Sequence, residues 1–392
     1  MPDRLVADWM QRDDLRALTA ALGPDQARYV GGAVRDTLLG LTVKDVDLAT
    51  PLPPDAVIER LNAAGIRTIP TGIEHGTVTA LLPLGPVEIT TLRHDVSTDG
   101  RRATVAFAHD WQDDAARRDF TINALYADPH SGELFDWFGG LADLAARHLR
   151  FIGDARQRIR EDHLRILRYF RFQARFGSQP ADPEAESACA ELAATLKGLS
   201  RERVGMEMMN LLGLPDPAPT VARMAELGVL GVVLPEADVP ALAALVAEEA
   251  RQGIGPDALR RLAALLPPDV PLAEAVASRF RLSGAQKKRL ATAAGRVPNG
   301  GEILEARALA YRLGREAALD RLLLAGASIA PLAGWEVPAF PLKGGEIVAR
   351  GVSAGPQVAR LLQAVEARWI AEGFPDQSRV GILLDEALKA RA

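Results

Sequence analysis

The segment KDVDLAT, residues 44–50, places two aspartates one residue apart in what otherwise reads as a short apolar strand. Successive side chains of a strand point to opposite faces, so Asp45 and Asp47 are expected on one face, with Val46 and Leu48 on the other. Two neighbouring carboxylates repel each other unless a cation lies between them, and Mg²⁺ is the usual partner of hard oxygen ligands. The pair therefore predicts a metal site, although an exposed strand end with solvated aspartates would have the same sequence.

Length and composition indicate a packed protein of several domains. The chain has 392 residues, of which 48% are hydrophobic and 25% are charged. This length exceeds one typical core, and the composition is too apolar for disorder. Aromatic residues make up only 5%, while alanine, leucine, arginine and glutamate recur, so most of the chain is expected to be helical.

The compartment is predicted from cysteine usage and from the N-terminus. Cys189 is the only cysteine, so neither an internal disulfide nor a cysteine-built zinc site supports the fold. The first 18 residues contain four aspartates and no uninterrupted apolar core, unlike a secretory signal or a transit peptide. No apolar run is long enough to span a membrane. These features favour a cytoplasmic protein without a membrane partner.

One basic segment stands out from an acidic chain. The net charge is −5 and the pI is about 5.8, which by itself argues against a nucleic-acid partner. Residues 151–175, however, hold seven arginines against three acids. A cationic strip of this kind is suited to polyphosphate or RNA.

Turn signals and periodicity divide the chain into an α/β part and a helical part. We expect one helix over residues 1–22, a strand over 27–30 and a short helix over 34–39. A further helix is predicted over 55–65, and 76–84 and 86–92 alternate like paired strands. From Leu141 onward the periodicity is helical. The predicted fold class is therefore α+β, with a small mixed sheet at the N-terminus.

The turn before the aspartates reads YVGGAVRDTLLG, residues 29–40. Gly31 and Gly32 have no side chains, so backbone amides there could approach a phosphate at the start of the next helix, with Arg35 one turn further on. A plain tight turn is the alternative. Its position shortly before the paired aspartates favours a nucleoside triphosphate site with an attached metal.

A second polar segment is RRDFTINAL, residues 117–125. Arg118 and Asp119 could reach a phosphate or a ribose hydroxyl, while Phe120 and Ile122 would anchor the segment in a core. A surface turn held by ion pairs would show the same pattern.

The third polar segment is EDHLRILRYFRF, residues 161–172, which we predict to be one helix. On that helix Glu161, Asp162, Arg165 and Arg168 would share one arc, opposite an apolar face. A carboxylate accepts hydrogen bonds and a guanidinium donates them, so Asp162 and Arg165 together could recognise the edge of a base. Salt bridges along an exposed helix face are the alternative.

In order and spacing, five segments resemble the signature motifs of class II CCA-adding tRNA nucleotidyltransferases and bacterial poly(A) polymerases. The resemblance covers about residues 27–212. The segments are GGAVRDTLLGLTVKDVDLAT (31–50), RRDFTINAL (117–125), DWFGG (136–140), EDHLRILRYFRF (161–172) and LSRERVGMEMMNLL (199–212). Five motifs in order are far more specific than any one of them.

The resemblance implies a polymerase-beta-like nucleotidyltransferase head over residues 1–140, a neck over 141–212 that carries the base-recognition helix, and an all-helical body and tail over 213–392 that bind tRNA. DWFGG would be the hinge between head and neck.

The resemblance also implies roles for individual residues. Asp45 and Asp47 would be the catalytic carboxylates and hold Mg²⁺. The implied nucleotide-binding residues are Gly32 and Arg35 at the triphosphate, Arg118 and Asp119 at the ribose, Asp162 and Arg165 at the base with Glu161 bracing them, and Arg168 and Arg171 at phosphates. Glu88 could add a supporting carboxylate.

The implied activity is the addition of C, C and A to the tRNA 3′ end from CTP and ATP without a nucleic-acid template. The GGAV turn and the acidic chain favour this over a poly(A) polymerase, and residues 93–111 resemble the flexible loop of enzymes that complete the terminal A, against a CC-only enzyme. An A-adding enzyme and a catalytically idle tRNA-binding factor stay open as alternatives. Residues 340–362 resemble the tail of the same family, with a glycine-rich turn that would face an RNA phosphate or simply connect two helices. No protein partner is inferable.

Overall fold

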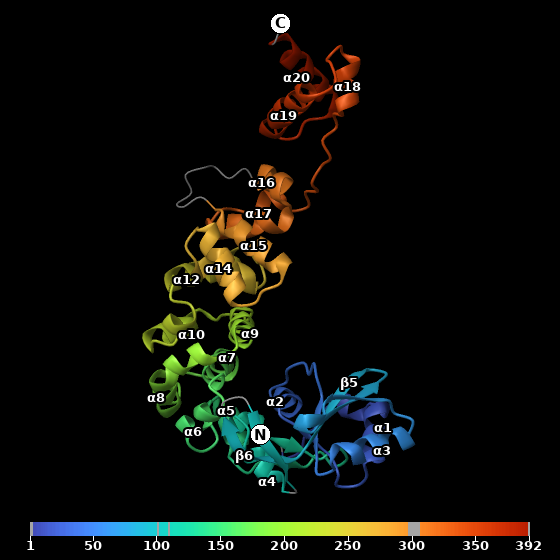
Figure 1. Ribbon diagram of the computed structural model, residues 1–392, viewed down its shortest axis with the longest axis vertical. Helices are drawn as coiled ribbons and strands as arrows, with labels where there is room; N and C mark the ends of the chain where they lie inside the picture. The colour runs from blue at the N-terminus through green and yellow to red at the C-terminus, as the bar shows by residue number, and fades with distance from the viewer. Residues whose placement is uncertain (1–2, 100–101, 109, 297–305, 391–392) are drawn as a thin grey trace. The chain divides into compact units, whose positions relative to one another are not determined.

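The computed structural model describes residues 3–99, 102–108, 110–296 and 306–390 (Figure 1). The chain forms two compact units, Met1–Pro235 and Glu236–Ala392. Every residue that the sequence assigns to the candidate site lies in the first unit. The division predicted at residues 140 and 212 stays a prediction.

A seven-stranded sheet forms the base of the first unit, in the order β3-β4-β5-β2-β1-β8-β9. Strand β2 runs parallel to β5 and every other neighbouring pair is antiparallel, so the mixed sheet is confirmed. The strands are β1 Arg28–Val30, β2 Asp47–Thr50, β3 Thr68–Gly72, β4 Thr77–Leu82, β5 Gly85–Thr91, β8 Tyr126–Ala127 and β9 Leu134–Phe135.

The predicted hairpin near Gly85 is confirmed, since β4 and β5 pair in register from Thr77 opposite Thr90 to Leu82 opposite Gly85. A separate two-stranded ribbon, β6 Arg93–Asp99 and β7 Arg102–Phe107, occupies the segment that resembles the flexible loop. Residues 100, 101 and 109 of that loop lie outside the described part.

Short helices accompany the sheet. They are η1 Asp8–Gln11, α1 Asp13–Leu22, α2 Gly32–Leu38, α3 Pro54–Ala63, η2 Ile73–His75, α4 Trp111–Ala116, η3 Thr121–Asn123 and α5 Gly140–Ala146. The prediction of one helix over residues 1–22 was wrong, because Arg12 is extended (ψ 127°) between η1 and α1. Its guanidinium turns to Asp14 in the first turn of α1 (Nη2–Oδ2 2.8 Å).

The DWFGG turn is tightly held at the start of α5. The Asp136 carboxylate accepts hydrogen bonds from the amides of Phe138 (3.2 Å), Gly140 (2.9 Å) and Leu141 (2.9 Å). Gly139 has a φ of +79°, and a Cβ on Gly140 would lie 2.3 Å from the Thr121 carbonyl oxygen. The left-handed backbone at Gly139 and the close approach at Gly140 are enough to explain why glycine occupies both positions, without a rotation of one domain against another.

Helices make up the rest of the first unit. They are α6 Ala155–Glu161, α7 Arg165–Phe176, α8 Pro183–Leu192, η4 Ala193–Gly198, α9 Arg201–Leu212, α10 Ala218–Glu226 and α11 Leu230–Val233. Phe120 is fully buried, and its ring packs at a tilt against Phe151 (5.0 Å between centroids) and Phe172 (5.2 Å). This confirms Phe120 as the anchor of segment 117–125 and attaches that segment to α7.

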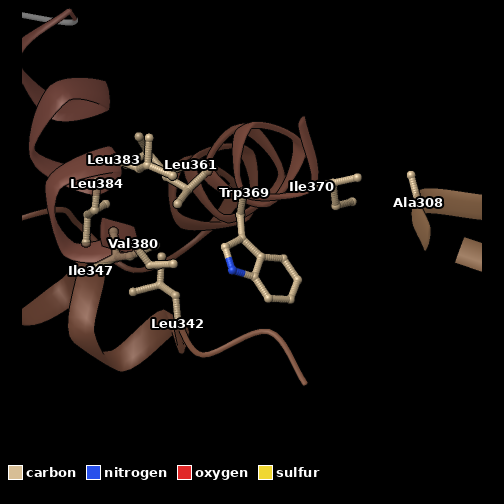
Figure 2. Close-up of a cluster of buried hydrophobic side chains, with 10 residues drawn as sticks. Ala308, Leu342, Ile347, Leu361, Trp369, Ile370, Val380, Leu383 and Leu384 are labelled. Atoms are coloured by element: carbon tan, nitrogen blue, oxygen red, sulfur yellow. The ribbon is translucent and has the colours of Figure 1, made fainter. Parts of the chain in front are cut away.

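The second unit is entirely helical in its described residues. It contains α12 Val239–Arg251, α13 Ala258–Leu265, α14 Val270–Arg279, α15 Gly284–Ala294, α16 Ala306–Leu313, α17 Arg315–Leu324, η6 Ala330–Leu332, α18 Gly344–Ala349, α19 Pro356–Ala371 and α20 Gln377–Lys389. Trp369 and its aliphatic neighbours form the core of the last three helices (Figure 2). No helix among the described residues is both long and apolar enough to cross a bilayer.

A buried charge network joins four helices of the second unit. Glu249 on α12 pairs with Arg260 (2.7 Å) and Arg261 (2.8 Å) on α13. Asp320 on α17 accepts from Arg260 (3.0 Å) and from Arg289 of α15 (2.7 Å). Glu249 and Asp320 are each 1% exposed, so these charges depend on one another rather than on water.

Removing one partner of this network should be costly. We expect Asp320→Ala to destabilise the second unit by about 3 kcal/mol, because the buried Arg260 and the half-buried Arg289 each lose one of their acceptors. Glu316→Ala is the matched control, since Glu316 lies on the same helix, contacts the same Arg289 (3.0 Å) and is 70% exposed. Thermal unfolding of the full chain measures both variants. Equal losses would contradict a stabilising role for the buried network.

Candidate active site

The two aspartates of KDVDLAT are placed differently from the prediction. Strand β2 begins at Asp47, and Asp45 lies exposed in the segment before it. Asp47 is half-buried and stands in register with Glu88 on the parallel strand β5. The predicted strand over both aspartates was therefore wrong, because Asp45 precedes β2, although Asp45 lies close enough to raise the pKa of Asp47. The carboxylate that lies beside Asp47 in the sheet is Glu88.

The surroundings of Asp47 disfavour its ionised form. Burial, with the nearby Glu88 and Asp45, raises the pKa of Asp47 to about 6, and the Arg118 guanidinium opposes this shift. A carboxylate in this condition gains from a cation. No group of three or more metal-ligating side chains occurs within the described ranges, so a metal at this edge would take most of its ligands from water or substrate.

The glycine turn precedes helix α2. Gly31 has a φ of +66° and its amide donates to the Leu125 carbonyl (3.1 Å), while Gly32 is the first residue of α2. Arg35, predicted at the triphosphate, is 7% exposed and donates to the Asp36 carboxylate (2.8 Å) and to the Asn123 side-chain oxygen (2.5 Å). In this structure Arg35 ties α2 to segment 117–125.

Arg118 lies beside the glycine turn and near Asp47. Its Nε donates to the Tyr126 hydroxyl (3.0 Å) and its Nη2 donates to Asp114 (3.1 Å). A Cβ on Gly31 would lie 3.6 Å from Nη1 of Arg118. Sequence reasoning missed Asp114 and Tyr126; the only signal was the position of Asp114 four residues before Arg118.

Asp119 and Arg168 form a buried ion pair between segment 117–125 and helix α7. Both Nε (2.8 Å) and Nη2 (2.6 Å) of Arg168 donate to one oxygen of Asp119, and Asn123 donates to the other (2.9 Å). Burial alone would raise the pKa of Asp119, but Arg168 and the Asn123 hydrogen bond hold it at about 2. Asp119 is therefore ionised at any working pH.

Glu207 of α9 extends this pair. It accepts from Arg171 (2.6 Å), lies 3.8 Å from Arg168 and is 3% exposed. Arg168 and Arg171, predicted at phosphates, thus have protein partners in this structure. The motif over residues 199–212 indicates no role for Glu207. The position of Glu207 in the sequence does not indicate its partners either.

The single helix predicted over residues 161–172 was also wrong. Helix α6 ends at Glu161, Asp162 is extended (φ −150°, ψ 104°), and α7 begins at Arg165. The Asp162 carboxylate accepts from the Leu164 amide (3.1 Å) and from Arg203 of α9 (2.7 Å). The Asp162 carboxylate and the Leu164 amide form an Asx turn, which the periodicity alone does not reveal. This turn interrupts the polar arc that was predicted along one helix.

Arg165 is held by three acceptors. Nη1 donates to the Arg158 carbonyl (2.9 Å) and to Glu161 (2.7 Å), and Nη2 donates to the Arg117 carbonyl (2.9 Å). The predicted bracing by Glu161 therefore occurs for Arg165, while Arg203 braces Asp162. Within the described part of the chain, Nε and one N–H of Nη2 make no hydrogen bond and stay available.

Residues 117–119 bring the predicted groups together. The carbonyl of Arg117 contacts Arg165, the side chain of Arg118 acts on Asp47, and the carboxylate of Asp119 holds Arg168. The Asp47 carboxylate, the glycine turn and Arg165, which is predicted to read the base, therefore lie around one short segment.

Comparison with known proteins places this arrangement in a family. The family model described as the poly(A) polymerase head domain matches residues 27–150, and that described as a probable RNA- and SrmB-binding site of polymerase A matches 181–239. The mitochondrial CCA tRNA nucleotidyltransferase 1 of Mus musculus is 36% identical over 389 residues, covering 92% of this chain and 87% of that protein. The chain belongs to the CCA tRNA nucleotidyltransferase family.

Other members of the family support the assignment. The CCA-adding enzyme of Geobacillus stearothermophilus is 40% identical over 211 residues, covering 53% of this chain and 50% of that protein. The crystal structure of the Bacillus stearothermophilus CCA-adding enzyme in complex with CTP matches with a TM-score of 0.73 and 26% identity, covering 98% of this chain and 99% of that one. The Thermotoga maritima CCA-adding enzyme complexed with tRNA shares the fold, with a TM-score of 0.70 and 19% identity over 97% of this chain and 99% of that one. The predicted family and fold class are confirmed.

The raised pKa of Asp47 predicts that neutralising this side chain stabilises the protein, by an amount that depends on pH. Since its pKa is near 6 in the fold and 3.8 as an ordinary aspartate, ionised Asp47 destabilises the fold increasingly as the pH rises from about 4 through 6. We expect Asp47→Asn to stabilise the metal-free protein at pH 7.5 by on the order of 2 kcal/mol and to give no gain near pH 4. Thermal unfolding at the two pH values is the measurement.

Asp45→Asn is the control for this experiment, because Asp45 is exposed and contributes least to the raised pKa of Asp47, so its neutralisation should give a much smaller gain in stability. Adding Mg²⁺ should then raise the melting temperature of the wild type more than that of Asp47→Asn. If Asp47→Asn were less stable than the wild type at pH 7.5, ionised Asp47 would not destabilise the fold, and the prediction would be wrong.

Proposed function

We propose that the protein adds C, C and A to the 3′ end of tRNA from CTP and ATP, releasing pyrophosphate. The observation that carries the proposal is the state of Asp162 and Arg165: both are fixed by protein partners, and both keep hydrogen-bonding capacity. They offer an acceptor beside a donor. The nucleotidyltransferase class itself follows from family membership.

This acceptor and donor pair suits two of the four bases. Cytosine and adenine each present an exocyclic amino donor beside a ring-nitrogen acceptor, so Asp162 would accept and Arg165 would donate. Uracil and guanine present a carbonyl acceptor and a ring N–H donor in those places. Either would oppose acceptor to acceptor and leave a buried polar group unsatisfied. The protein itself would thus replace the template.

The carboxylates would act on the reacting groups. Asp45 and Asp47, with Glu88 in support, fit a hard divalent cation by their chemistry and by the raised pKa of Asp47. Mg²⁺ bound there would lower the pKa of the tRNA 3′-hydroxyl and offset charge on the phosphates during attack on the α-phosphorus. Asp45 and Asp47 would orient that centre, and no covalent enzyme intermediate is required.

The remaining predicted residues would hold the nucleotide. The turn at Gly32 would face the triphosphate, with Arg35 supporting the turn from inside. Nη1 of Arg118, which makes no hydrogen bond to the described residues, would face the triphosphate as well, so Arg118 would take a phosphate role in place of the ribose role that the resemblance implied. Asp119 and Arg168 would meet the ribose and phosphates as a pair, since Arg168 keeps 32% of its side chain exposed. Arg171, tied to Glu207, would complete the basic edge.

Family likeness and the basic segment over residues 151–175 support tRNA as the partner. We keep the division into a head (1–140), a neck (141–212) and a tRNA-binding body and tail (213–392) as part of this proposal. The turn from Gly351 to Gly355, between α18 and α19, would offer amides to an RNA phosphate. We propose the cytoplasm as the compartment; the mammalian relatives are named mitochondrial proteins, which is the alternative.

A poly(A) polymerase is the second candidate, favoured by the family description that matches residues 27–150. Incubation with tRNA lacking its 3′ end, Mg²⁺ and labelled CTP and ATP separates the two functions. We expect three nucleotides to be added in the order C, C, A. Long A tracts would indicate the polymerase, partial products an A-adding or CC-adding enzyme, and no incorporation an idle binding factor.

Catalysis should depend on the β2 carboxylates. We expect Asp47→Ala to lower the rate of nucleotide addition at least 10³-fold, because the reacting groups lose their charged anchor. Asp55→Ala, an exposed first-turn aspartate of α3, is the control and should retain the wild-type rate. An active, folded Asp47→Ala protein would overturn the assigned catalytic centre.

Base selectivity should depend on Arg203, because it fixes Asp162. We expect Arg203→Ala to reduce the preference for CTP and ATP over UTP and GTP by about tenfold, on the scale of 1–3 kcal/mol per base-reading pair. Arg201→Ala, exposed on the same helix, should leave the preference unchanged. The ratios of kcat/KM for the four nucleotides are the measurement, and unchanged ratios in Arg203→Ala would argue against this role.

A further inference from the structure

One buried carboxylate beside the site has no part in the proposed mechanism. Asp114 on α4 is 1% exposed and accepts from the Tyr126 hydroxyl (2.5 Å), from Arg117 (Nε 2.8 Å) and from Arg118 (3.1 Å). A charge this deep needs several donors to stay in the fold. Asp114 is therefore committed to these three side chains, and of these only Arg118 is predicted to bind the nucleotide.

Asp114 and its partner Tyr126 both accept hydrogen bonds from the guanidinium of Arg118. Nη2 donates to Asp114 while Nε donates to the Tyr126 hydroxyl, so one edge of the planar group is fixed at two points. The other end, Nη1, makes no hydrogen bond to the described residues. It lies on the side of the Gly31 turn, where a Cβ would be 3.6 Å away.

Tyr126 is itself rigid and belongs to the same strand system as that turn. It is fully buried, and its strand β8 pairs with β1 so that Tyr126 stands opposite Val30, the residue before Gly31. The rings of Trp137 (5.5 Å) and Trp111 (6.1 Å) meet it edge to face. The hydroxyl is thus a fixed point with respect to the glycine turn.

We propose that Asp114 and Tyr126 form a positioning pair that holds Arg118 with Nη1 turned toward the Gly31–Gly32 turn, where it meets the anionic part of an incoming nucleoside triphosphate. The inference rests on the proposed function and deepens it. Asp114 touches no substrate and acts only through Arg118. Because Asp114 and Tyr126 already hold two N–H groups on one edge of Arg118, the side chain loses little further conformational entropy when it binds the nucleotide.

The pair serves any nucleotide equally. Phosphates and ribose are common to CTP and ATP, whereas base reading belongs to Asp162 and Arg165 on the other side of segment 117–119. Loss of the positioning pair should therefore weaken use of both nucleotides by the same factor. The preference over UTP and GTP should not change.

The test begins with Asp114→Asn and its neighbour Asp113→Asn as the matched control, since Asp113 is exposed on the same helix. We expect Asp114→Asn to lower kcat/KM for CTP and for ATP by 10- to 100-fold, mainly through KM, with base selectivity unchanged. Asp113→Asn should match the wild type. A normal kcat/KM in folded Asp114→Asn, or a change in base selectivity, would overturn the proposal.

A double-mutant cycle with Arg118→Ala separates positioning from general stability. If Asp114 acts through Arg118, Asp114→Asn should have little further effect on KM in the Arg118→Ala background. Additive losses would instead assign Asp114 a structural role and overturn the proposal. Should Asp114→Asn fail to fold, Tyr126→Phe replaces it in the cycle, because it removes one hydroxyl and keeps the buried ring.

Direct binding distinguishes failure of this inference from failure of the proposed function. Calorimetric titration of wild type and variants with CTP, in the absence of tRNA, reports the contact of Arg118 whether or not nucleotides are transferred. Weaker CTP binding in Asp114→Asn or Tyr126→Phe supports the positioning pair even if no tRNA is extended. Equal CTP affinity in all variants overturns the pair and leaves the transfer assay to decide the activity.

Discussion

The ion pair between Asp119 and Arg168 is the contact on which the site depends. It joins segment 117–125, which leads into strand β8, to helix α7. Each end continues into further bonds: Asn123 and Arg35 on one side, Glu207 on the other. Loss of Arg168 would leave the Asp119 carboxylate, which is only 7% exposed, without its charged partner. Through this ion pair, the strand that carries Asp47 and the helix that carries Arg165 belong to one packed body.

Much of this arrangement was predictable because it depends on local pattern. The alternation of residues 76–92 predicts the β4–β5 hairpin, the apolar Phe120 predicts an anchor, and the ordered motifs identify the family. The errors arose where a local pattern is ambiguous. A helical period runs through residues 161–172, but α6 ends at Glu161, and the Asp162 carboxylate accepts from the Leu164 amide in an Asx turn before α7. Periodicity does not reveal a hydrogen bond of this kind between a side chain and the backbone.

The partners of the predicted residues could not be read from the sequence. Asp114, Arg203 and Glu207 act on residues that the motifs single out, yet Glu207 and its partner Arg171 are separated by 36 positions and Arg203 and Asp162 by 41. Such contacts depend on how helices pack, which composition and spacing leave open. The same holds for the Glu249 and Asp320 network, where ordinary helical sequence hides a buried set of charges.

The immobilised guanidinium of Arg165 has a consequence for the order of synthesis. Three of its N–H groups are committed to the protein, so in the proposed function this side chain would offer the same donors at every step, and cytosine and adenine would satisfy them alike. Hydrogen bonding at the base edge would then give no signal for changing from pyrimidine to purine. The space left beside the lengthening RNA end would have to set that change, so the protein would respond to the size of the RNA end and not to its sequence.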